Sequence, residues 1–149
     1  MKIAVHQMCS GIQVPINTQE ITKALRVSAA ENAIMYFAPE MSFMLDRDRQ
    51  RAALSIMAEK DNPMLQQICA VAAAEKIWVH LGSIPILHED GSGRYGNRTI
   101  VIDSDGIIRA RYDKMHLFDV DLATGESWRE SSAYRGGDGP VLEIGRAHV

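Results

Sequence analysis

The strongest structural signal in this chain is residues 99–112, which read TIVIDSDGIIRARY. Two apolar runs, Thr99 to Asp103 and Ile107 to Tyr112, stand on either side of the short segment Ser104-Asp105-Gly106. An Asp-Gly pair tolerates the positive φ that a tight turn between antiparallel strands requires. The stretch therefore predicts a β-hairpin.

The residues before the hairpin contain three further strand patterns. Short apolar runs over residues 2–7, 34–38 and 77–86 predict strands, and the second of these ends at Pro39. The segment between the third run and the hairpin, residues 89–96, is rich in glycine and predicts a loop. Far beyond the hairpin, residues 141–144 predict one last short strand.

Helix patterns separate the first strands. Asn17 and Glu20 resemble a capping box at the start of a helix that extends to about Asn32. A polar helix is predicted over about residues 46–59, and Asn62 followed by Pro63 predicts the start of another helix. Strand and helix patterns that alternate before a hairpin predict an α/β fold with a mixed sheet.

The composition is typical of a globular protein with one domain. The 149 residues are 46% hydrophobic and 23% charged, and the formal net charge of −3 leaves no basic face for nucleic acid. No stretch is apolar for long enough to span a bilayer, and the N-terminus does not resemble a signal peptide. Cys9 and Cys69 stand far apart and suggest no disulfide framework, so we expect a reducing, cytoplasmic setting.

Two charged residues follow predicted strands directly. Glu40 comes after the run 34–38 and Pro39, which places a carboxylate at a buried rim of the sheet, where ligands of α/β folds bind and a general base could act. Lys114 comes two residues after the hairpin and could direct its ammonium group at a developing oxyanion. Without further context, an exposed loop glutamate and a surface lysine are equally valid interpretations.

Other polar residues give weaker indications. Glu130 is an isolated acid near aromatic residues, and Asp113 is interpreted as a solvated turn residue. His6 and Cys9 have the spacing of a metal-binding pair, but no second pair completes a zinc site. The chain contains no glycine-rich nucleotide motif and no Gly-x-Ser-x-Gly motif. We therefore expect no metal, no nucleotide cofactor and no serine nucleophile.

Taken together and in order, these segments resemble the nitrilase superfamily of carbon–nitrogen hydrolases. Residues 37–40, FAPE, are similar to the family's general-base motif, in which Phe-Pro-Glu is commoner and Ala38 is a departure. The strongest match includes Asn97, covers the hairpin and residues 114–121, KMHLFDVD, and continues with Glu130. The resemblance extends over essentially the whole chain.

This resemblance implies a four-layer α-β-β-α sandwich, of which residues 1–149 supply about the first half. It also implies a Glu-Lys-Cys triad in which Glu40 is the general base and Lys114 stabilises the oxyanion, with Glu130 as a second glutamate that orients the lysine or the substrate. The family's nucleophilic cysteine would lie just beyond Val149, since neither Cys9 nor Cys69 has the required position. We therefore expect the N-terminal part of one hydrolase domain, truncated before its nucleophile.

The function that the resemblance implies is hydrolysis of the C–N bond of a small amide through a thioester, without a cofactor. The version HLFDVD at residues 116–121 is similar to the branch of ω-amidases and deaminated glutathione amidases. The complete enzyme is expected to form a homodimer, without nucleic-acid or membrane partners. Residues 1–149 alone are expected to be inactive and poorly stable, because sheet edges and apolar faces meant for the second half would be exposed. The alternative is a non-catalytic module that binds a carboxamide or a protein partner.

Overall fold

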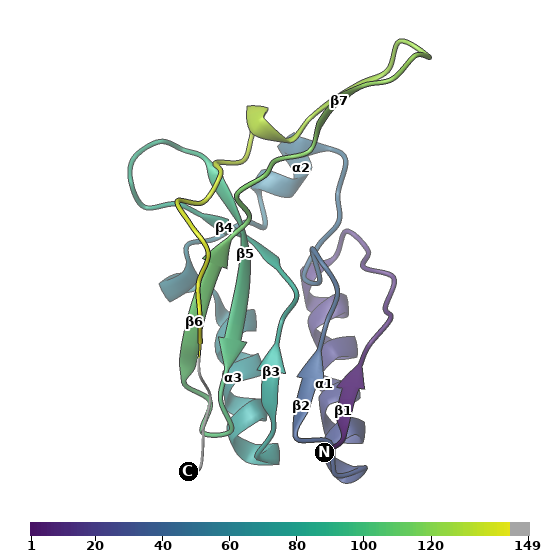
Figure 1. Cartoon of the computed structure of the whole chain (residues 1–149), viewed down its shortest axis with the longest axis vertical. Coiled ribbons are helices and arrows are strands. Elements are labelled where there is room, and N and C mark those ends of the chain that lie inside the picture. Colours follow the sequence, from purple (N-terminus) through teal and green to yellow (C-terminus); the bar gives the residue numbers. More distant parts are fainter. Residues whose placement is uncertain (144–149) are drawn as a thin grey trace.

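The computed structural model describes residues 1–143 and contains a six-stranded mixed sheet with its long helices on one face (Figure 1). The first three strands are parallel, and the later three pair in antiparallel fashion. The third and fourth strands pair one after the other with one edge of the fifth strand, and the sixth pairs with its other edge. The strands are β1 (Ile3–Val5), β2 (Met35–Phe37), β3 (Trp78–His80), β4 (Ile84–Leu87), β5 (Tyr95–Ile102) and β6 (Ile108–Asp113).

The predicted hairpin and the mixed α/β character are confirmed. β5 and β6 pair in antiparallel fashion around a turn in which Gly106 has a φ of +79°. The side chain of Asp103 accepts hydrogen bonds from the backbone N–H groups of Asp105 and Ile107, both at 2.9 Å, and so stabilises this turn. β5 begins earlier than expected, at Tyr95, so the glycine-rich loop is two residues shorter than predicted.

The prediction of one strand over residues 77–86 is wrong, because the chain breaks it into β3 and β4 at residues 81–83. Gly82 lies in this break with a φ of +61°, a backbone conformation that strands do not contain. At the other end of the chain, residues 141–143 form no strand, and position 144 of the predicted last strand lies outside the described residues.

Helix α1 (Val14–Ala30) begins three residues before the predicted capping box. Pro15 occupies its first turn, where a missing N–H costs nothing. Asn17 therefore lies inside the helix, where it is buried and donates hydrogen bonds to the carbonyl oxygens of Gly11 and Phe43 at 2.9 and 2.8 Å. The residue ties two loops together, and the capping-box prediction is wrong.

Helix α3 (Pro63–Glu75) begins as predicted, since Asn62 caps it by accepting from the N–H groups of Met64 and Leu65. The long polar helix over residues 46–59 is wrong: only the short α2 (Arg49–Ala53) and a 3-10 turn (Glu59–Asp61) form there. Among the described residues, no helix is both long and apolar enough to cross a membrane.

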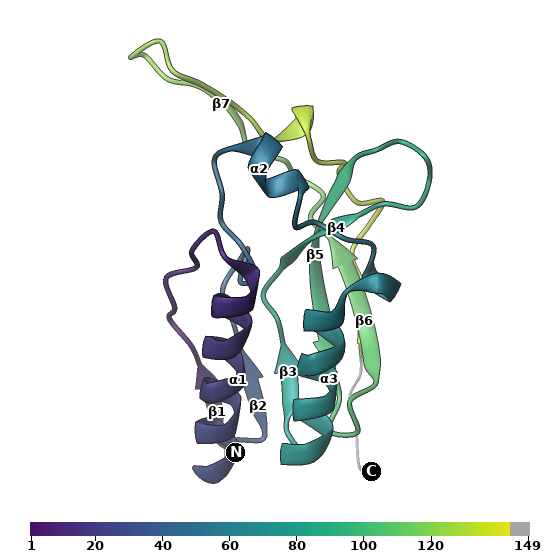
Figure 2. The same ribbon diagram turned by 180° about the vertical axis from the view of Figure 1, so that it is seen from behind.

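The hydrophobic core lies between one face of the sheet and helices α1 and α3, which stand side by side in front of the sheet in Figure 2. Ala4 of β1 packs against this core, so its neighbours Ile3 and Val5 point to the opposite face. Their exposed fractions are 48% and 75%. The low stability expected of residues 1–149 on their own remains a prediction.

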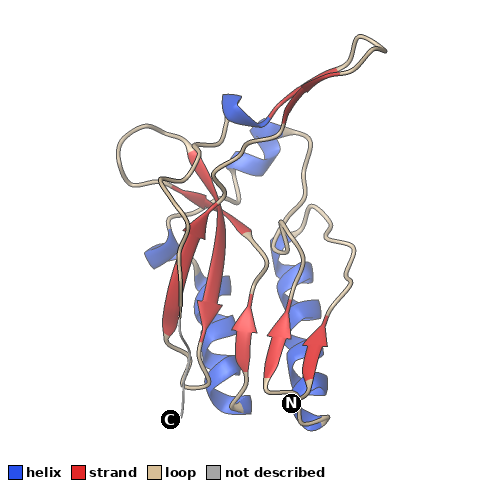
Figure 3. Cartoon of the chain, viewed as in Figure 1, coloured by secondary structure: helices blue, strands red, loops and turns tan. Residues whose placement is uncertain are grey.

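A two-stranded arm formed by β7 (Asp119–Asp121) and β8 (Ser127–Arg129) projects from the end of the sheet that also carries α2 (Figure 3). A short 3-10 helix (Glu130–Ser132) follows the arm at its base. β2 and β6 both run toward this same end, so the residues that follow these strands gather beneath the arm (Figure 1).

Candidate active site

Three charged side chains from distant parts of the sequence meet at this end of the sheet. Lys114 follows β6, Glu40 follows β2, and Glu130 begins the 3-10 helix at the base of the arm. The ammonium nitrogen Nζ of Lys114 lies 3.1 Å from Oε1 of Glu40 and 3.0 Å from Oε2 of Glu130. One cation is thus held between two carboxylates.

The backbone around Glu40 is held by the loop that separates β3 from β4. The N–H of Met41 donates to Oγ of Ser83 at 3.0 Å, and the N–H of Ser42 donates to the carbonyl oxygen of Ser83 at 2.8 Å. Met41 has a φ of +54°, which is uncommon for a residue with a side chain and is retained where the surroundings enforce it. This rigid turn, rather than packing around the carboxylate, sets the position of Glu40.

The buried rim expected for Glu40 is wrong, because 60% of its side chain is exposed. The residue follows Pro39 at the end of the sheet, where its carboxylate points away from the core and borders an open cavity. Its contacts are therefore those of an accessible acid whose direction depends on hydrogen bonds.

We expect Gly82→Ala to lower the free energy of unfolding by about 3 kcal/mol or more. A Cβ atom at Gly82 would lie 2.1 Å from the carbonyl oxygen of Pro39, and the φ of +61° would add strain. The measurement is denaturant unfolding followed by circular dichroism. Gly91→Ala is the matched control, since Gly91 has a φ of +77° but open space around its Cβ position. That variant is expected to lose only about 1 kcal/mol; equal losses in the two variants would contradict the tight fit of Gly82.

Lys114 is about one-third exposed and is protonated in this arrangement. Burial by itself would lower the pKa of its ammonium group, but the hydrogen bonds to Glu130 and Glu40 outweigh this effect and raise the pKa above its ordinary value. A lysine with a raised pKa is a stable positive charge, suited to stabilise an anion and unsuited to act as a base near neutral pH.

Glu130 is the more enclosed of the two glutamates, with 11% of its side chain exposed. Burial would raise the pKa of its carboxyl group, but hydrogen bonds from the N–H of Phe118, from Lys114 and from Asn97 hold the pKa below its ordinary value. Oε2 accepts from Phe118 at 2.6 Å and from Lys114 at 3.0 Å. The carboxylate is consequently ionised and saturated with donors, as expected of a group that holds Lys114 in place.

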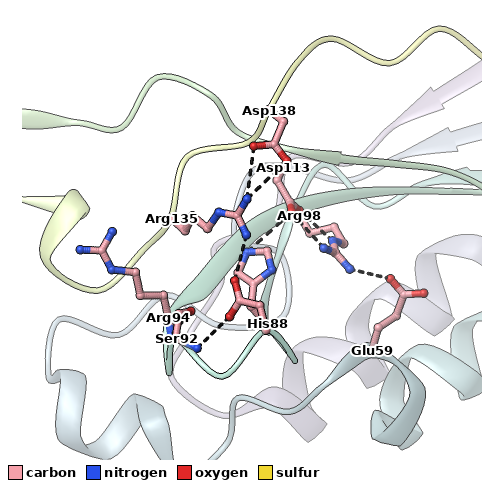
Figure 4. Close-up of polar contacts among 9 residues, drawn as sticks. Glu59, His88, Ser92, Arg94, Arg98, Asp113, Arg135 and Asp138 are labelled. Carbon is pink, nitrogen blue, oxygen red and sulfur yellow. Dashed lines mark hydrogen bonds and ion pairs between the residues drawn. The ribbon is translucent and has the colours of Figure 1, made fainter.

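A network of ion pairs lies directly behind the end of β6 (Figure 4). Asp113, which precedes Lys114, accepts two hydrogen bonds from Arg98 at 2.7 and 2.9 Å, and Arg98 also donates to Glu59 at 3.0 Å. Burial alone would raise the pKa of Asp113, but Arg98 outweighs it and holds the pKa low. The expectation of a solvated turn residue is thus wrong, because Asp113 anchors the strand end that carries Lys114.

The three charged residues border a cavity of about 690 Å³. This volume is within the usual range for small-molecule sites. Aromatic side chains form part of its wall, among them Tyr95, Phe118, Trp128 and Tyr134. Neither cysteine of the chain is among the described residues that border it, since Cys9 is exposed elsewhere and Cys69 packs against the core from α3. Within residues 1–143, no group of three or more His, Cys, Asp or Glu side chains is arranged to hold a metal ion.

Residues 2–149 match the protein family described as carbon-nitrogen hydrolase. The chain belongs to the carbon-nitrogen hydrolase family. It is 28% identical, over 96% of its length, to deaminated glutathione amidase from Yersinia enterocolitica, and covers 52% of that protein. It is 30% identical, over 83% of its length, to an omega-amidase from Pongo abelii, and covers 44% of it. The chain thus spans about half the length of these relatives.

Solved structures of carbon-nitrogen hydrolases share the fold. The NitFhit protein of Caenorhabditis elegans superposes with a TM-score of 0.77 at 28% identity, covering 91% of this chain and 33% of that one. An amidase from Nesterenkonia sp. AN1 superposes with a TM-score of 0.76 at 20% identity, covering 97% of this chain and 54% of that one. The expected nitrilase-like α/β fold is confirmed, and the described residues contribute one sheet and the helices on one of its faces.

One residue of this carbon-nitrogen hydrolase site had no role in the sequence interpretation. Asn97 of β5 is buried, and its Nδ2 lies 2.8 Å from Oε1 of Glu40 and 3.3 Å from Oε1 of Glu130. The available signal was a polar amide in a strand, one residue before Arg98 and two before the apolar run of the hairpin. Buried polar side chains in strands usually have specific hydrogen-bond partners.

Proposed function

We propose that this chain is the N-terminal part of a single carbon–nitrogen hydrolase domain that cleaves a small amide by covalent catalysis. The observation that carries the proposal is the placement of the Lys114 ammonium 3.1 Å from the Glu40 carboxylate at the edge of a small-molecule cavity. A base and an oxyanion-stabilising cation are two of the three groups that acyl transfer through a nucleophile requires.

The third group in this proposal is a cysteine thiol in sequence that follows Val149. Cys9 and Cys69 do not border the cavity formed by the described residues. The Nesterenkonia amidase, which shares the fold, is described as having an active-site cysteine. We use the term extended protein for residues 1–149 together with the sequence that follows them in the natural polypeptide. A reducing compartment such as the cytoplasm would keep the thiol free.

The proposed reaction begins when Glu40 takes the proton of the thiol and the thiolate attacks the amide carbonyl carbon. Lys114, held by Glu130, stabilises the negative charge that develops on the carbonyl oxygen. The C–N bond then breaks, the leaving nitrogen takes the proton from Glu40, and a thioester remains. Water gives a proton to Glu40 and attacks the thioester, which releases the carboxylic acid and restores the thiol. No redox partner or cofactor takes part.

The proposed substrate class is a short ω-amide. The relatives named above are an omega-amidase and a deaminated glutathione amidase, whose names describe amide hydrolysis. The cavity of about 690 Å³ would hold a molecule of this size, with its aromatic wall against the aliphatic part and its charged end at the scissile amide. We propose a homodimer as the native assembly, from the resemblance to the family.

The test measures ammonia released from succinamate by the extended protein and by residues 1–149. We expect turnover by the extended protein, its loss after treatment with iodoacetamide, and no turnover by residues 1–149 alone. If the extended protein is folded and binds succinamate but releases no ammonia, the hydrolase proposal fails and the non-catalytic binding module is favoured. Turnover that is unaffected by iodoacetamide would refute the thioester mechanism.

A further inference from the structure

Asn97 is the most enclosed polar residue in contact with both glutamates of the site. Only 3% of the residue is exposed, and it lies on β5 beside the strand end that carries Lys114, whose N–H donates to the backbone oxygen of Asn97 at 2.9 Å. The side-chain amide reaches Glu40 at 2.8 Å and Glu130 at 3.3 Å. One residue thus contacts all three charged groups.

The hydrogen bonds of the two carboxylates are distributed unequally. Both donors to Glu40, Nδ2 of Asn97 and Nζ of Lys114, bond to the same oxygen, Oε1. Among the described residues, no donor reaches Oε2 of Glu40. In Glu130 both oxygens are occupied, because Oε1 accepts from Asn97 and Oε2 from Lys114 and Phe118. Only Glu40 therefore retains a carboxylate oxygen that can accept a proton from a nucleophile.

We propose that Asn97 is a positioning residue that selects Glu40 as the base, by holding Oε1 of Glu40 and Oε1 of Glu130 and leaving Oε2 of Glu40 free. The inference rests on the proposed hydrolase function. Asn97 suits this role because its NH₂ group carries two protons, one for each carboxylate. The amide oxygen cannot take that place, since it would then face two anions.

The energetics of Asn97 do not fit a purely structural residue. Its Oδ1 is buried and has no hydrogen-bond partner among the described residues, which is unfavourable for a polar atom. Leucine has a similar shape and would avoid this loss, so packing alone does not require an amide at this position. The exposed Glu40 side chain has few other contacts that fix its direction, which is the function we assign to Asn97.

The experiment compares wild type, Asn97→Leu and Asn97→Asp in the extended protein. For Asn97→Leu we expect kcat to fall 10- to 100-fold, because a hydrogen bond to a charged group is lost, while KM changes less than about threefold. The acidic limb of the pH–rate profile should move to higher pH, since the ionised carboxylate loses a donor. Asn97→Asp, which places a third carboxylate beside Lys114, should lose more activity.

A second measurement does not depend on turnover. The carboxyl ¹³C signal of Glu130, followed by NMR as a function of pH, should titrate at higher pH in both variants, because Asn97 contributes to its low pKa. An unchanged Glu130 midpoint in a folded variant, or an unchanged kcat in an active protein, overturns the inference. If wild type shows no turnover but the Glu130 midpoint moves, the hydrolase proposal fails and the positioning of the carboxylates stands.

The matched control is Thr22→Val in helix α1. Thr22 is also buried, and its Oγ1 likewise has no hydrogen-bond partner among the described residues. Removal of this polar atom should leave kcat, the pH–rate profile and the Glu130 titration unchanged. Circular dichroism confirms folding of each variant, and the isosteric Asn97→Asp replaces Asn97→Leu if the latter does not fold. A Thr22→Val protein with the same defects as Asn97→Leu would assign both to general destabilisation and overturn the inference.

Discussion

Replacement of Lys114 by methionine is expected to lower kcat of the extended protein about 10³-fold with succinamate as substrate. Methionine keeps the length of the side chain but removes the charge that lies 3.1 and 3.0 Å from the two carboxylates. The oxyanion then loses its cation, and Glu40 and Glu130 are left as neighbouring anions. Ammonia release under saturating substrate measures the loss.

The same variant should also change how stability depends on pH. In wild type the pKa of Glu130 is lowered below its ordinary value of 4.5, so its ionised form stabilises the fold above that pH. This contribution disappears as the pH falls through the lowered pKa. In Lys114→Met two anions without a cation should raise the pKa of one carboxyl group, so the melting temperature should fall more at neutral pH than at pH values below about 4.

Lys76→Met is the control for Lys114→Met, because Lys76 is an exposed lysine that pairs with Asp105 at the hairpin turn, away from the cavity. We expect kcat and the pH dependence of melting to match wild type. A Lys114→Met protein that keeps more than one-tenth of wild-type kcat would remove Lys114 from the proposed mechanism.

Replacement of Glu40 by glutamine is expected to lower kcat between about 10²- and 10⁴-fold, the usual range for loss of a general base. Glutamine has the same shape and can still accept a hydrogen bond from Lys114, and the site is exposed, so the melting temperature should change little. The thiol of the extended protein should also react more slowly with iodoacetamide at neutral pH. Both rates can be measured on the same protein preparation.

Glu89→Gln is the control for Glu40→Gln, since Glu89 is an exposed glutamate that pairs with Lys60 outside the cavity. It should leave kcat and the iodoacetamide rate unchanged. If Glu40→Gln is folded and its kcat stays within threefold of wild type, Glu40 is not the base and the assignment of Asn97 fails with it.

Features that depend on neighbouring residues were predictable from the sequence. The hairpin around Gly106 and the cap formed by Asn62 both use contacts within a few residues, so their patterns were sufficient. Contacts with remote residues explain the errors. Asn17 has the composition of a cap, but its partner Phe43 lies 26 positions away, and Gly82 breaks a strand in order to pack against Pro39.

The sequence by itself determined the alternation of strands and helices, the hairpin, and Glu40, Lys114 and Glu130 as candidates in a family resemblance. Only the tertiary structure decided that Lys114 lies between the two glutamates, that Glu40 is exposed, and that Asn97 contacts both acids. The physical reason is range: hydrophobic periodicity and caps are local, whereas this site is assembled by pairing of β5 with β6 and by an arm that returns Glu130 to Lys114.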